Sequence, residues 1–173
     1  PNLMLTAQHC VARVTSSNVI CGRSGFGSKI SANNIQVTTS ANIFRATEVY
    51  RAAEVYVPPG GNDMCGFDMA LVRLAENIPA TSATPVIPRI DGFPARGETY
   101  AAIGYGHTGW DQGSGIRRRI ENRQVQCAGD CPSYTTVQST EFLGTDGTCQ
   151  GDSGGTALDS KGRVLGALSR GPS

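Results

Sequence analysis

The chain has 173 residues, which is enough for one large domain or two small ones. Apolar residues make up 39 % of it, charged residues 17 %, and the formal net charge is +1. This composition excludes an intrinsically disordered chain and gives no reason to expect a nucleic-acid partner, and no apolar run approaches the roughly 18 residues needed for membrane insertion.

Short runs of β-forming residues alternate with turn residues along the chain, a pattern typical of β-sandwiches and β-barrels. Helical periodicity is scarce, and one short helical turn is expected at residues 7–11. The predicted strands, in chain order, comprise residues 3–6, 18–21, 35–39, 48–57, 69–74, 99–104, 123–127, 155–158 and 163–169. The last two form the clearest hairpin, because the residues between them supply Asp, Ser and Gly for its turn.

Residues 77–97 differ in composition from the rest of the chain. They contain Pro79, Pro85, Pro88 and Pro94 and show little alternation of apolar and polar residues. Because proline cannot donate a hydrogen bond to a β-ladder, this stretch is predicted to connect two halves of similar size.

Six cysteines are many for a cytosolic domain of this length. They predict three disulfides in an oxidising compartment. Cys127 and Cys131 are close enough in sequence to close a small loop, and Cys10 with Cys21 is another local pair, but the sequence does not choose among the full pairings. A metal site at Cys127 and Cys131 is disfavoured, because no second pair and no histidine lies at a fitting spacing.

Ser153 lies between glycines in the segment Cys-Gln-Gly-Asp-Ser-Gly-Gly, residues 149–155. Glycine lets a backbone approach a substrate closely and leaves amide groups free to point at one spot. The spacing Gly-x-Ser-x-Gly also fits the nucleophile elbow of α/β-hydrolases. In that fold a histidine follows the serine, whereas His9 and His107, the two histidines of this chain, both precede it, so this alternative is disfavoured.

A serine needs a base to become a good nucleophile, and the base needs a group that orients it. His9 lies beside a cysteine in Thr-Ala-Gln-His-Cys, and Asp68 stands at the head of the apolar run Met-Ala-Leu-Val. A carboxylate in that position risks burial, and an imidazole N–H is a suitable partner for it. The order His9, Asp68, Ser153 is that of the chymotrypsin arrangement.

Three blocks resemble the signatures of the trypsin/chymotrypsin family: Thr-Ala-Gln-His-Cys, Asp-Met-Ala-Leu and Gly-Asp-Ser-Gly-Gly. Two more follow in the right order, because Gly-Tyr-Gly at 104–106 resembles the family's Gly-Trp-Gly and Ser-Arg-Gly at 169–171 resembles its substrate-binding Ser-Trp-Gly. The resemblance covers essentially the whole chain. It implies an all-β fold of two antiparallel six-stranded β-barrels, residues 1–80 and 96–173, joined by residues 81–95, with the active site between them.

The resemblance also implies a serine endopeptidase that hydrolyses peptide bonds through an acyl-enzyme, by the family's established mechanism. Ser153 is then the nucleophile, His9 the base and Asp68 the group that orients the base. The backbone N–H groups of Gly151 and Ser153 form the oxyanion hole, and Asp152 pairs with a new N-terminal ammonium on zymogen activation. No metal or organic cofactor is required, and the partners are peptide or protein substrates and, as a further class, protein protease inhibitors.

The substrate-binding residues that the resemblance assigns are Gly147, Thr148, Gln150, Ser169, Arg170 and Gly171. Trypsin-like members carry an aspartate at the base of the primary pocket, at the position of Gly147, and Asp146 is one residue off. A preference for Arg or Lys is therefore not supported, and a neutral pocket for apolar or small side chains is expected. Arg170 replaces the family's Trp and alters one wall of the cleft.

The chain is expected to begin and end inside the family's domain, because only residues 1–5 precede the histidine block and little follows Gly171. The family partners of Cys10, Cys149 and Asp152 are then expected outside this sequence, which leaves four cysteines for pairing: Cys21, Cys65, Cys127 and Cys131. No signal peptide is visible, so a secreted or extracellular location, periplasmic in a bacterium, is expected from the cysteines and the family alone.

Two rival functions belong to other classes. An inactive family member could act as a binding module, but the intact set of three residues argues against it. An esterase without peptidase activity would differ in its substrates. His107 is expected to be a polar loop residue, and Arg117, Arg118 and Arg119 a solvated loop or strand end rather than an anion site, because the net charge is close to zero.

Overall fold

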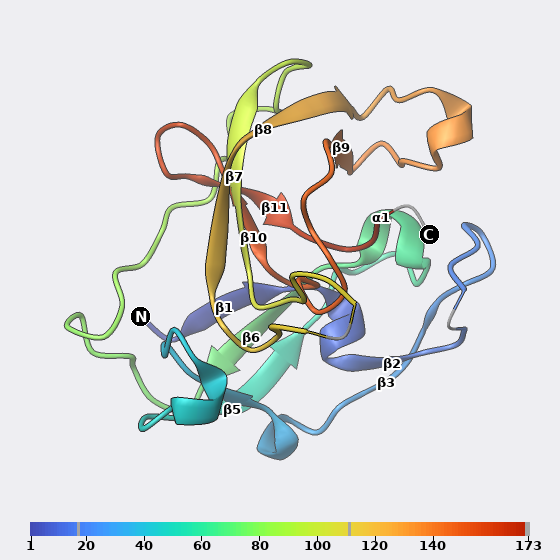
Figure 1. The fold of residues 1–173 in the computed structure, drawn as a ribbon. Helices are drawn as coiled ribbons and strands as arrows, with labels where there is room; N and C mark the ends of the chain where they lie inside the picture. The colour runs from blue at the N-terminus through green and yellow to red at the C-terminus, as the bar shows by residue number, and fades with distance from the viewer. Residues whose placement is uncertain (17, 111, 172–173) are drawn as a thin grey trace.

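The described residues, 1–16, 18–110 and 112–171 of a computed structural model, fold mainly into antiparallel β-strands (Figure 1). The first half of the chain supplies β1 (Leu3–Thr6), β2 (Ala12–Val14), β3 (Phe26–Lys29), β4 (Gln36–Val37), β5 (Tyr50–Tyr56) and β6 (Ala70–Leu74). The second half supplies β7 (Thr99–Gly104), β8 (Arg118–Ala128), β9 (Phe142–Gly144), β10 (Thr156–Leu158) and β11 (Val164–Ala167). The helical turns are η1 (Gln8–Cys10), η2 (Ala32–Asn34), η3 (Ile43–Arg45), α1 (Met64–Phe67) and η4 (Ser133–Thr135).

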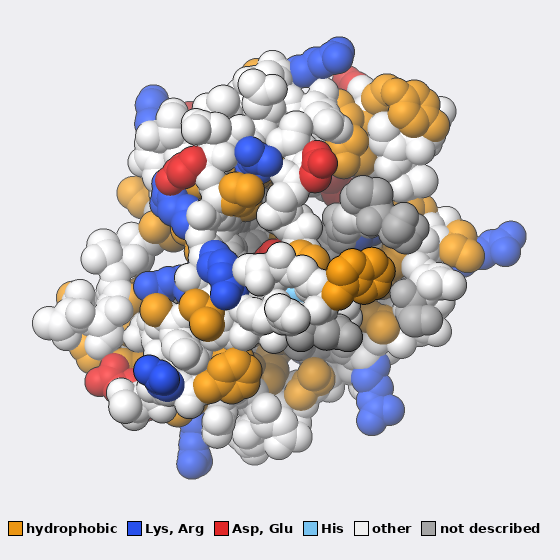
Figure 2. All heavy atoms as spheres, viewed as in Figure 1, with side chains coloured by type: hydrophobic (Ala, Val, Ile, Leu, Met, Phe, Trp, Pro, Cys, Tyr) orange, Lys and Arg blue, Asp and Glu red, His pale blue; other side chains and the backbone are white. Residues whose placement is uncertain are grey.

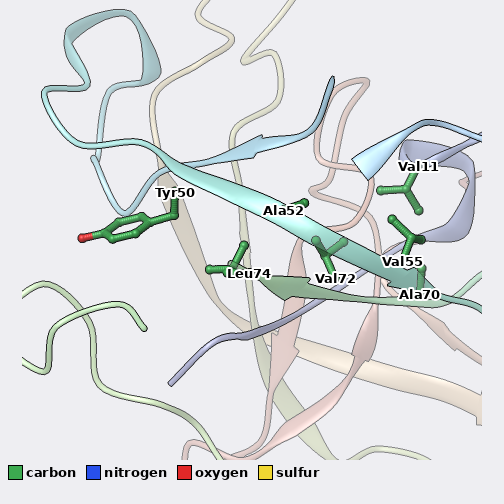
Figure 3. Close-up of a cluster of buried hydrophobic side chains, with 7 residues drawn as sticks. All are labelled: Val11, Tyr50, Ala52, Val55, Ala70, Val72 and Leu74. Atoms are coloured by element: carbon green, nitrogen blue, oxygen red, sulfur yellow. The ribbon is translucent and has the colours of Figure 1, made fainter. Parts of the chain in front are cut away.

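The strands of the first half form an antiparallel sheet in the order β1-β6-β5-β4, beside which β2 pairs with β3. Alternation along β5 and β6 turns one face of these strands inward, where Val72 and Leu74 are only 0 % and 1 % exposed. Figure 3 shows the cluster that they form with neighbours from the same strands and from η1: Val11, Tyr50, Ala52, Val55 and Ala70. This core fixes the end of β1 and the start of β6, the two places from which His9 and Asp68 project.

The strands of the second half form another antiparallel sheet, in the order β11-β10-β7-β8-β9. Its buried core consists of Tyr100, Val125 and Ala157. The ring of Phe142 packs edge-on against Tyr100 with a centroid distance of 5.6 Å and an interplanar angle of 81°, a favoured aromatic geometry. Because Ala157 lies on β10, this core fixes the strand that directly follows Ser153.

The chain therefore forms two curled antiparallel half-barrels with few helices, and the predicted all-β fold is confirmed. Within the described residues, the first half contains a four-stranded and a two-stranded sheet, and the second half a five-stranded one. In Figure 1 the labelled strands β1, β5 and β6 lie below β7, β8 and β11, and the stretch after β11 runs towards α1. The stretch after β11, which belongs to the second half, thus meets the first half near α1.

One predicted strand, residues 18–21, was wrong. There the backbone N–H of Ile20 donates to Ser24 Oγ at 2.8 Å, and Ser24 N–H donates back to the Ile20 carbonyl at 2.8 Å, so the segment closes into a turn. Strands β2, β3 and β9 were not predicted, and β8 begins at Arg118 rather than at Arg123. Asn122, with φ +56°, interrupts β8 at a shift in register and hides the earlier part of the strand from a simple pattern.

The described residues contain two disulfides, Cys21–Cys65 and Cys127–Cys131, while Cys10 and Cys149 are free and exposed. The four cysteines that the resemblance left for pairing are therefore the four that pair, whereas three disulfides within this sequence and the local pair Cys10–Cys21 were wrong. Turn η1 holds Cys10 against the second half of the chain, close to Gly154. Cys21 instead lies beside α1, where it is bonded to Cys65.

Residues 77–97 contain none of the named strands in their described structure, as predicted. The stretch is nevertheless tied to β11, because Arg89 N–H donates to the Val164 carbonyl at 2.9 Å and Val164 N–H donates to the Ile87 carbonyl at 3.0 Å. On the face seen in Figure 2, the Lys and Arg side chains lie apart from one another, with apolar and neutral side chains between them. None of the described helices is long and apolar enough to cross a membrane.

Candidate active site

Asp68 is placed by a tight turn between α1 and β6. Asp63 caps α1 by accepting the backbone N–H of Cys65 at 2.9 Å, and the chain then turns sharply as Met69 N–H donates to the Phe67 carbonyl at 2.8 Å. The backbone angles of Asp68, φ −80° and ψ 62°, are those of an inverse γ-turn, which is common at the ends of strands. Its side chain is only 1 % exposed, so its charge needs partners inside the protein.

His9 supplies two of those partners. The backbone N–H of His9 donates to Asp68 Oδ1 at 2.9 Å, and His9 Nδ1 lies 2.7 Å from Asp68 Oδ2. Turn η1 presents both groups on the same side, because it follows β1 directly and bonds Cys10 N–H to the Ala7 carbonyl at 3.1 Å. The carboxylate therefore fixes both the backbone and the ring of His9, which leaves Nε2 of the ring as the atom that can face a reacting group.

The same contact shifts the pKa values of both residues. The hydrogen bond to Asp68 raises the pKa of His9 above its ordinary value, a smaller effect of Cys10 acts in the same direction, and burial opposes them only in part. Burial alone would raise the pKa of Asp68, but hydrogen bonds from His9 and Ser169 outweigh it and hold that pKa below its ordinary value. Asp68 thus stays ionised while His9 becomes a stronger proton acceptor.

Ser153 follows one tight turn and stands inside the next. In the first, Asp152 N–H donates to the Cys149 carbonyl at 3.0 Å, and in the second, Gly155 N–H donates to the Asp152 carbonyl at 2.8 Å. The third residue of each turn is a glycine with positive φ, +90° at Gly151 and +76° at Gly154, as a type II turn requires. This local geometry explains the spacing Gly-x-x-Gly around the serine.

Two contacts bring the serine segment to His9 and Asp68. A Cβ added at Gly154, the residue after Ser153, would lie 3.2 Å from the backbone N of Ala7 and 3.2 Å from Cys10 Sγ, the two positions on either side of turn η1. Ser169, which lines the same cavity as Ser153, donates its hydroxyl to Asp68 Oδ2 at 2.5 Å. The structure therefore brings together side chains from both halves of the chain.

Some of the backbone N–H groups around Ser153 donate hydrogen bonds within the part of the protein that the structure describes and others do not. The N–H groups of Asp152, Gly154 and Gly155 donate to protein carbonyls, whereas the described residues offer no acceptor to the N–H groups of Gly151 and Ser153. Unpaired backbone donors beside a nucleophile can stabilise a negatively charged oxygen. Gly151 and Ser153 are the two donors that the sequence assigned to the oxyanion hole.

Asp152 is held by backbone donors. Its Oδ1 accepts the N–H of Gly106 at 2.7 Å and its Oδ2 accepts the N–H of Cys149 at 2.9 Å. A Cβ at Gly106 would lie 2.6 Å from Asp152 Cγ, and a Cβ at Gly104 would also collide with the carboxylate. No cation of the described residues makes an ion pair with Asp152, so its predicted role in an activation salt bridge stays a prediction.

A cavity of about 290 Å³ opens beside Ser153. Its walls include five of the residues assigned to substrate binding, Thr148, Gln150, Ser169, Arg170 and Gly171, together with Cys149 and Leu168. Gly147 is not among the lining residues, because its Cα faces β8, where a Cβ would lie 2.8 Å from Ile120 Cδ1. Asp146 is also absent from the lining and its carbonyl accepts Arg123 Nη1 at 2.9 Å.

One functional residue was missed at the sequence level. Glu141 forms a two-pronged ion pair with Arg170, with N–O distances of 2.6 Å and 2.7 Å, and so neutralises the cation in the cavity wall. A glutamate before a short apolar run carries no signal for such a role. His107 lies in a loop and donates its backbone N–H to the Gln150 carbonyl at 2.9 Å, next to the site rather than in it.

The three arginines around the start of β8 form hydrogen bonds or ion pairs with other groups of the protein. Arg118 Nη1 donates to the Gly113 carbonyl at 2.5 Å, Arg117 Nη1 donates to the Thr39 carbonyl at 3.3 Å, and Arg119 pairs with Glu121. In the part of the chain that the structure describes, no three His, Cys, Asp or Glu side chains gather closely enough to hold a metal ion.

Comparisons with known proteins identify a family by sequence and a similar fold by structure. The family model described as Trypsin matches residues 1–173, the whole chain. Among solved structures, neuropsin, a serine protease expressed in the limbic system of mouse brain, superposes with a TM-score of 0.71 over 99 % of this chain and 73 % of its own, at 18 % sequence identity. A search of curated proteins by sequence gave no match.

Proposed function

Because the chain belongs to the trypsin family of serine proteases, we propose that it is a serine endopeptidase in which Ser153, His9 and Asp68 carry out catalysis. One observation supports this most directly: the buried carboxylate of Asp68 lies 2.7 Å from His9 Nδ1 and accepts a hydrogen bond from Ser169, which lines the same cavity as Ser153. A buried acid that orients an imidazole is what an activated serine requires.

The proposed reaction has the two stages of the family's mechanism. In the first, Ser153 Oγ attacks the scissile carbonyl carbon while His9 Nε2 takes the hydroxyl proton, and the protonated His9 then gives that proton to the leaving amine. In the second, water attacks the acyl-enzyme with His9 again as base, and the Ser153 ester bond breaks. Asp68 holds the imidazole in the required tautomer and stabilises its protonated form throughout.

The oxyanion that forms in each stage needs donors that are already in place. The unpaired N–H groups of Gly151 and Ser153 are suited to this task, since the two glycine turns hold the backbone open at this point. In a comparable enzyme, loss of one such donor costs about 2.7–4 kcal/mol in the barrier.

We further propose that the primary pocket accepts apolar or small neutral side chains. The cavity beside Ser153 is lined mainly by neutral groups, its one lining cation, Arg170, is paired with Glu141, and Asp146 is not among the lining residues. A substrate Lys or Arg would find no unpaired carboxylate among these lining residues.

Residues 1–80 and 96–173 are proposed as the two catalytic halves, with 81–95 as their connector, because each half has its own buried core. The two disulfides favour a location outside the reducing cytosol, and we propose that the protein acts in an extracellular or periplasmic space. Peptides or proteins are then its substrates, and protein inhibitors of proteases are a further proposed class of partner.

The test is covalent labelling with an organophosphonate probe, followed by intact mass and fragment mass spectrometry. A single adduct on Ser153 is expected, absent in Ser153→Ala and strongly slowed in His9→Ala. Because the free thiol of Cys149 lines the same cavity, Cys149→Ser is the matched control and must keep the adduct. Folded protein that gives no serine adduct would contradict the proposal.

Unlabelled protein from the same preparation should also be assayed on matched peptide amide and ester substrates. Hydrolysis of both is expected of an endopeptidase, whereas hydrolysis of the ester alone would favour an esterase. No turnover of either, with a normal adduct on Ser153, would favour a family member that binds but does not cleave peptides.

A further inference from the structure

Glu141 and Arg170 form a partly buried ion pair at the back of the candidate active site. Arg170 Nη1 lies 2.6 Å from Glu141 Oε1, and Arg170 Nη2 lies 2.7 Å from Glu141 Oε2, so the guanidinium and the carboxylate meet side by side. Their side chains are 20 % and 17 % exposed. This burial and the paired geometry distinguish the contact from an ordinary surface ion pair.

The carboxylate of Glu141 also holds the backbone that leads to Asp68. Its Oε1 accepts the N–H of Gly66 at 2.8 Å, while the neighbouring Thr140 donates its hydroxyl to the Gly66 carbonyl at 2.8 Å. Gly66 has φ +95°, and a Cβ there would lie 3.2 Å from Thr140 Oγ1, so only glycine fits without strain. A segment of the second half of the chain thus fixes both backbone groups of a residue two positions before Asp68.

The guanidinium of Arg170 reaches the other side of Asp68. Arg170 lines the cavity next to Ser153, and its Nη1 lies 3.4 Å from Ser169 Oγ, the hydroxyl that donates to Asp68 Oδ2. Its Nη2 donates to the Thr136 carbonyl at 3.0 Å. The ion pair therefore connects the substrate-facing segment after β11 with the turn that presents the catalytic acid.

The pair also sets the charges around Asp68, the residue that raises the pKa of His9 most. The carboxylates that act on Arg170 are Glu141, Asp68 and Asp63, and Glu141 dominates in raising the pKa of Arg170. Burial would raise the pKa of Glu141, but its bonds to Arg170 and to the backbone hold that pKa below its ordinary value, so it stays ionised. Arg170 thus has its main partner in Glu141, and Asp68 keeps its hydrogen bonds to His9.

We propose that Glu141 and Arg170 form a positioning pair for the active site. The pair fixes the position of the Asp68 turn relative to the substrate-binding segment at residues 168–171. It also keeps the Arg170 cation from forming an ion pair with Asp68. This inference rests on the proposed endopeptidase function. It adds two residues that touch neither the scissile bond nor His9 and act through Asp68 and Ser169.

The decisive measurement is the pKa of His9 by NMR titration of its imidazole protons, because this readout does not depend on turnover. Glu141→Gln leaves the Arg170 cation uncompensated beside Asp68 and is expected to lower the His9 pKa by about 0.5–1 pH unit. Arg170→Met leaves the Glu141 carboxylate uncompensated and is expected to raise it. The double variant is expected to return it close to the wild-type value.

Glu121→Gln is the matched control, since it removes the same charge from an exposed ion pair with Arg119 on β8 and should leave the His9 pKa unchanged. Opposite shifts in the two single variants are a result that a merely structural role would not give. Shifts of the same sign, or shifts no larger than that of the control, would overturn the proposal.

Kinetics provide the second readout on the same variants. Glu141→Gln is expected to raise KM about fivefold, as for the loss of one hydrogen bond, because the substrate-binding segment loses its anchor to the Asp68 turn. Wild-type protein that takes up no phosphonate probe would refute the endopeptidase function while leaving the NMR test intact. If Glu141→Gln fails to fold, Arg170→Met and Arg170→Lys still decide, because only the former is expected to raise the His9 pKa.

Discussion

Asp68 accepts three hydrogen bonds although its side chain is almost fully buried. Two come from His9, through the backbone N–H and the ring, and one comes from the hydroxyl of Ser169. Removing a buried carboxylate from such a set leaves several donors without an acceptor. The orientation of His9 and the local stability of the candidate active site therefore depend on the same three hydrogen bonds.

This shared dependence predicts that activity and stability change in opposite directions with pH. The raised pKa of His9 means that its stabilising contact is complete below the unfolded value of 6.5 and is lost as pH rises through the folded pKa. The lowered pKa of Asp68 means that its contribution is present above 3.8 and is lost as pH falls through its folded pKa. Catalysis, in contrast, needs neutral His9, so kcat/KM is expected to rise as pH rises through the folded pKa of His9.

We therefore expect the free energy of unfolding of wild type to exceed that of Asp68→Asn most strongly between pH 3.8 and pH 6.5. We expect kcat/KM to rise above that range, as His9 loses its proton. Chemical denaturation and kinetics over the same pH series check both curves. Asp68→Asn should lower kcat by about 10⁴-fold, the effect known for this exchange in the family's template. A stability difference that grows as His9 loses its proton would contradict the assignment.

The three proposed catalytic residues could be predicted because each lies in a short contiguous block around His9, Asp68 or Ser153. Glu141 could not be predicted, since its partners Gly66 and Arg170 lie 75 and 29 positions away and no local pattern marks it. The hydrogen bond from Ser169 to Asp68 spans 101 positions and is equally invisible in the sequence. Long-range polar contacts of this kind arise only when the two halves pack.

At the scale of elements, the loop after β7 and the serine loop fit together through glycines. Gly106 donates its N–H to Asp152, and its Cα leaves no room for a side chain against that carboxylate. The N–H of Asp152 in turn closes the glycine turn that precedes Ser153. The position of the proposed oxyanion donors therefore depends on a residue outside the serine motif.

Gly106→Ala is expected to lower kcat by on the order of 10²-fold, because a Cβ at 2.6 Å from Asp152 Cγ must displace the carboxylate and with it the donors at Gly151 and Ser153. Gly109→Ala is the control, since nothing lies within 4 Å of a Cβ at that position of the same loop. Steady-state kinetics and circular dichroism of both variants provide the comparison. Equal activity in the two would show that the loop adapts to the added methyl group.

Strand prediction succeeded where burial alternates along the strand, as in β5 and β6, and failed where other forces decide. Strand β3 contains Gly27 and Ser28, weak β-formers that are held by pairing with β2. Residues 18–21 have a β-like composition, but Ser24 and the bond from Cys21 to Cys65 fold them into a turn. Such competition between local propensity and distant partners is decided only in the folded chain.

The two disulfides are expected to differ in their contribution to stability. Cys21–Cys65 closes a loop with a sequence separation of 44, whereas the separation for Cys127–Cys131 is 4. Loop-closure entropy then gives about 4 kcal/mol for the first and about 2 kcal/mol for the second. Cys21→Ala/Cys65→Ala should lower Tm by roughly 10 °C and Cys127→Ala/Cys131→Ala by roughly 5 °C in differential scanning calorimetry. The reverse order would contradict an entropic origin.

At the scale of the whole molecule, the connector is the covalent link between two halves that are otherwise joined by packing and hydrogen bonds. Neither disulfide crosses between them, because Cys21–Cys65 lies in the first half and Cys127–Cys131 in the second. The contacts between Gly66 and Glu141 and between Asp68 and Ser169 hold the halves together at the active site.

Limited digestion of Ser153→Ala with a protease of broad specificity is therefore expected to cut first within residues 80–86, which are largely exposed, rather than at 87–89, where hydrogen bonds tie the chain to β11. The two fragments should elute together from a sizing column and separate in denaturant without reductant. Separation under native conditions would mean that the connector, and not the packed interface, holds the halves together.

Cys10 and Cys149 acquire a further use from their positions. Both are free and exposed, one follows His9 in the first half, and the other lines the cavity beside Ser153 in the second, while the remaining cysteines are occupied in disulfides. A pair of spin or fluorescent labels can therefore be attached, one on each half, without introducing a foreign cysteine. Changes in the label-to-label distance would report directly whether the two halves come apart as denaturant is added.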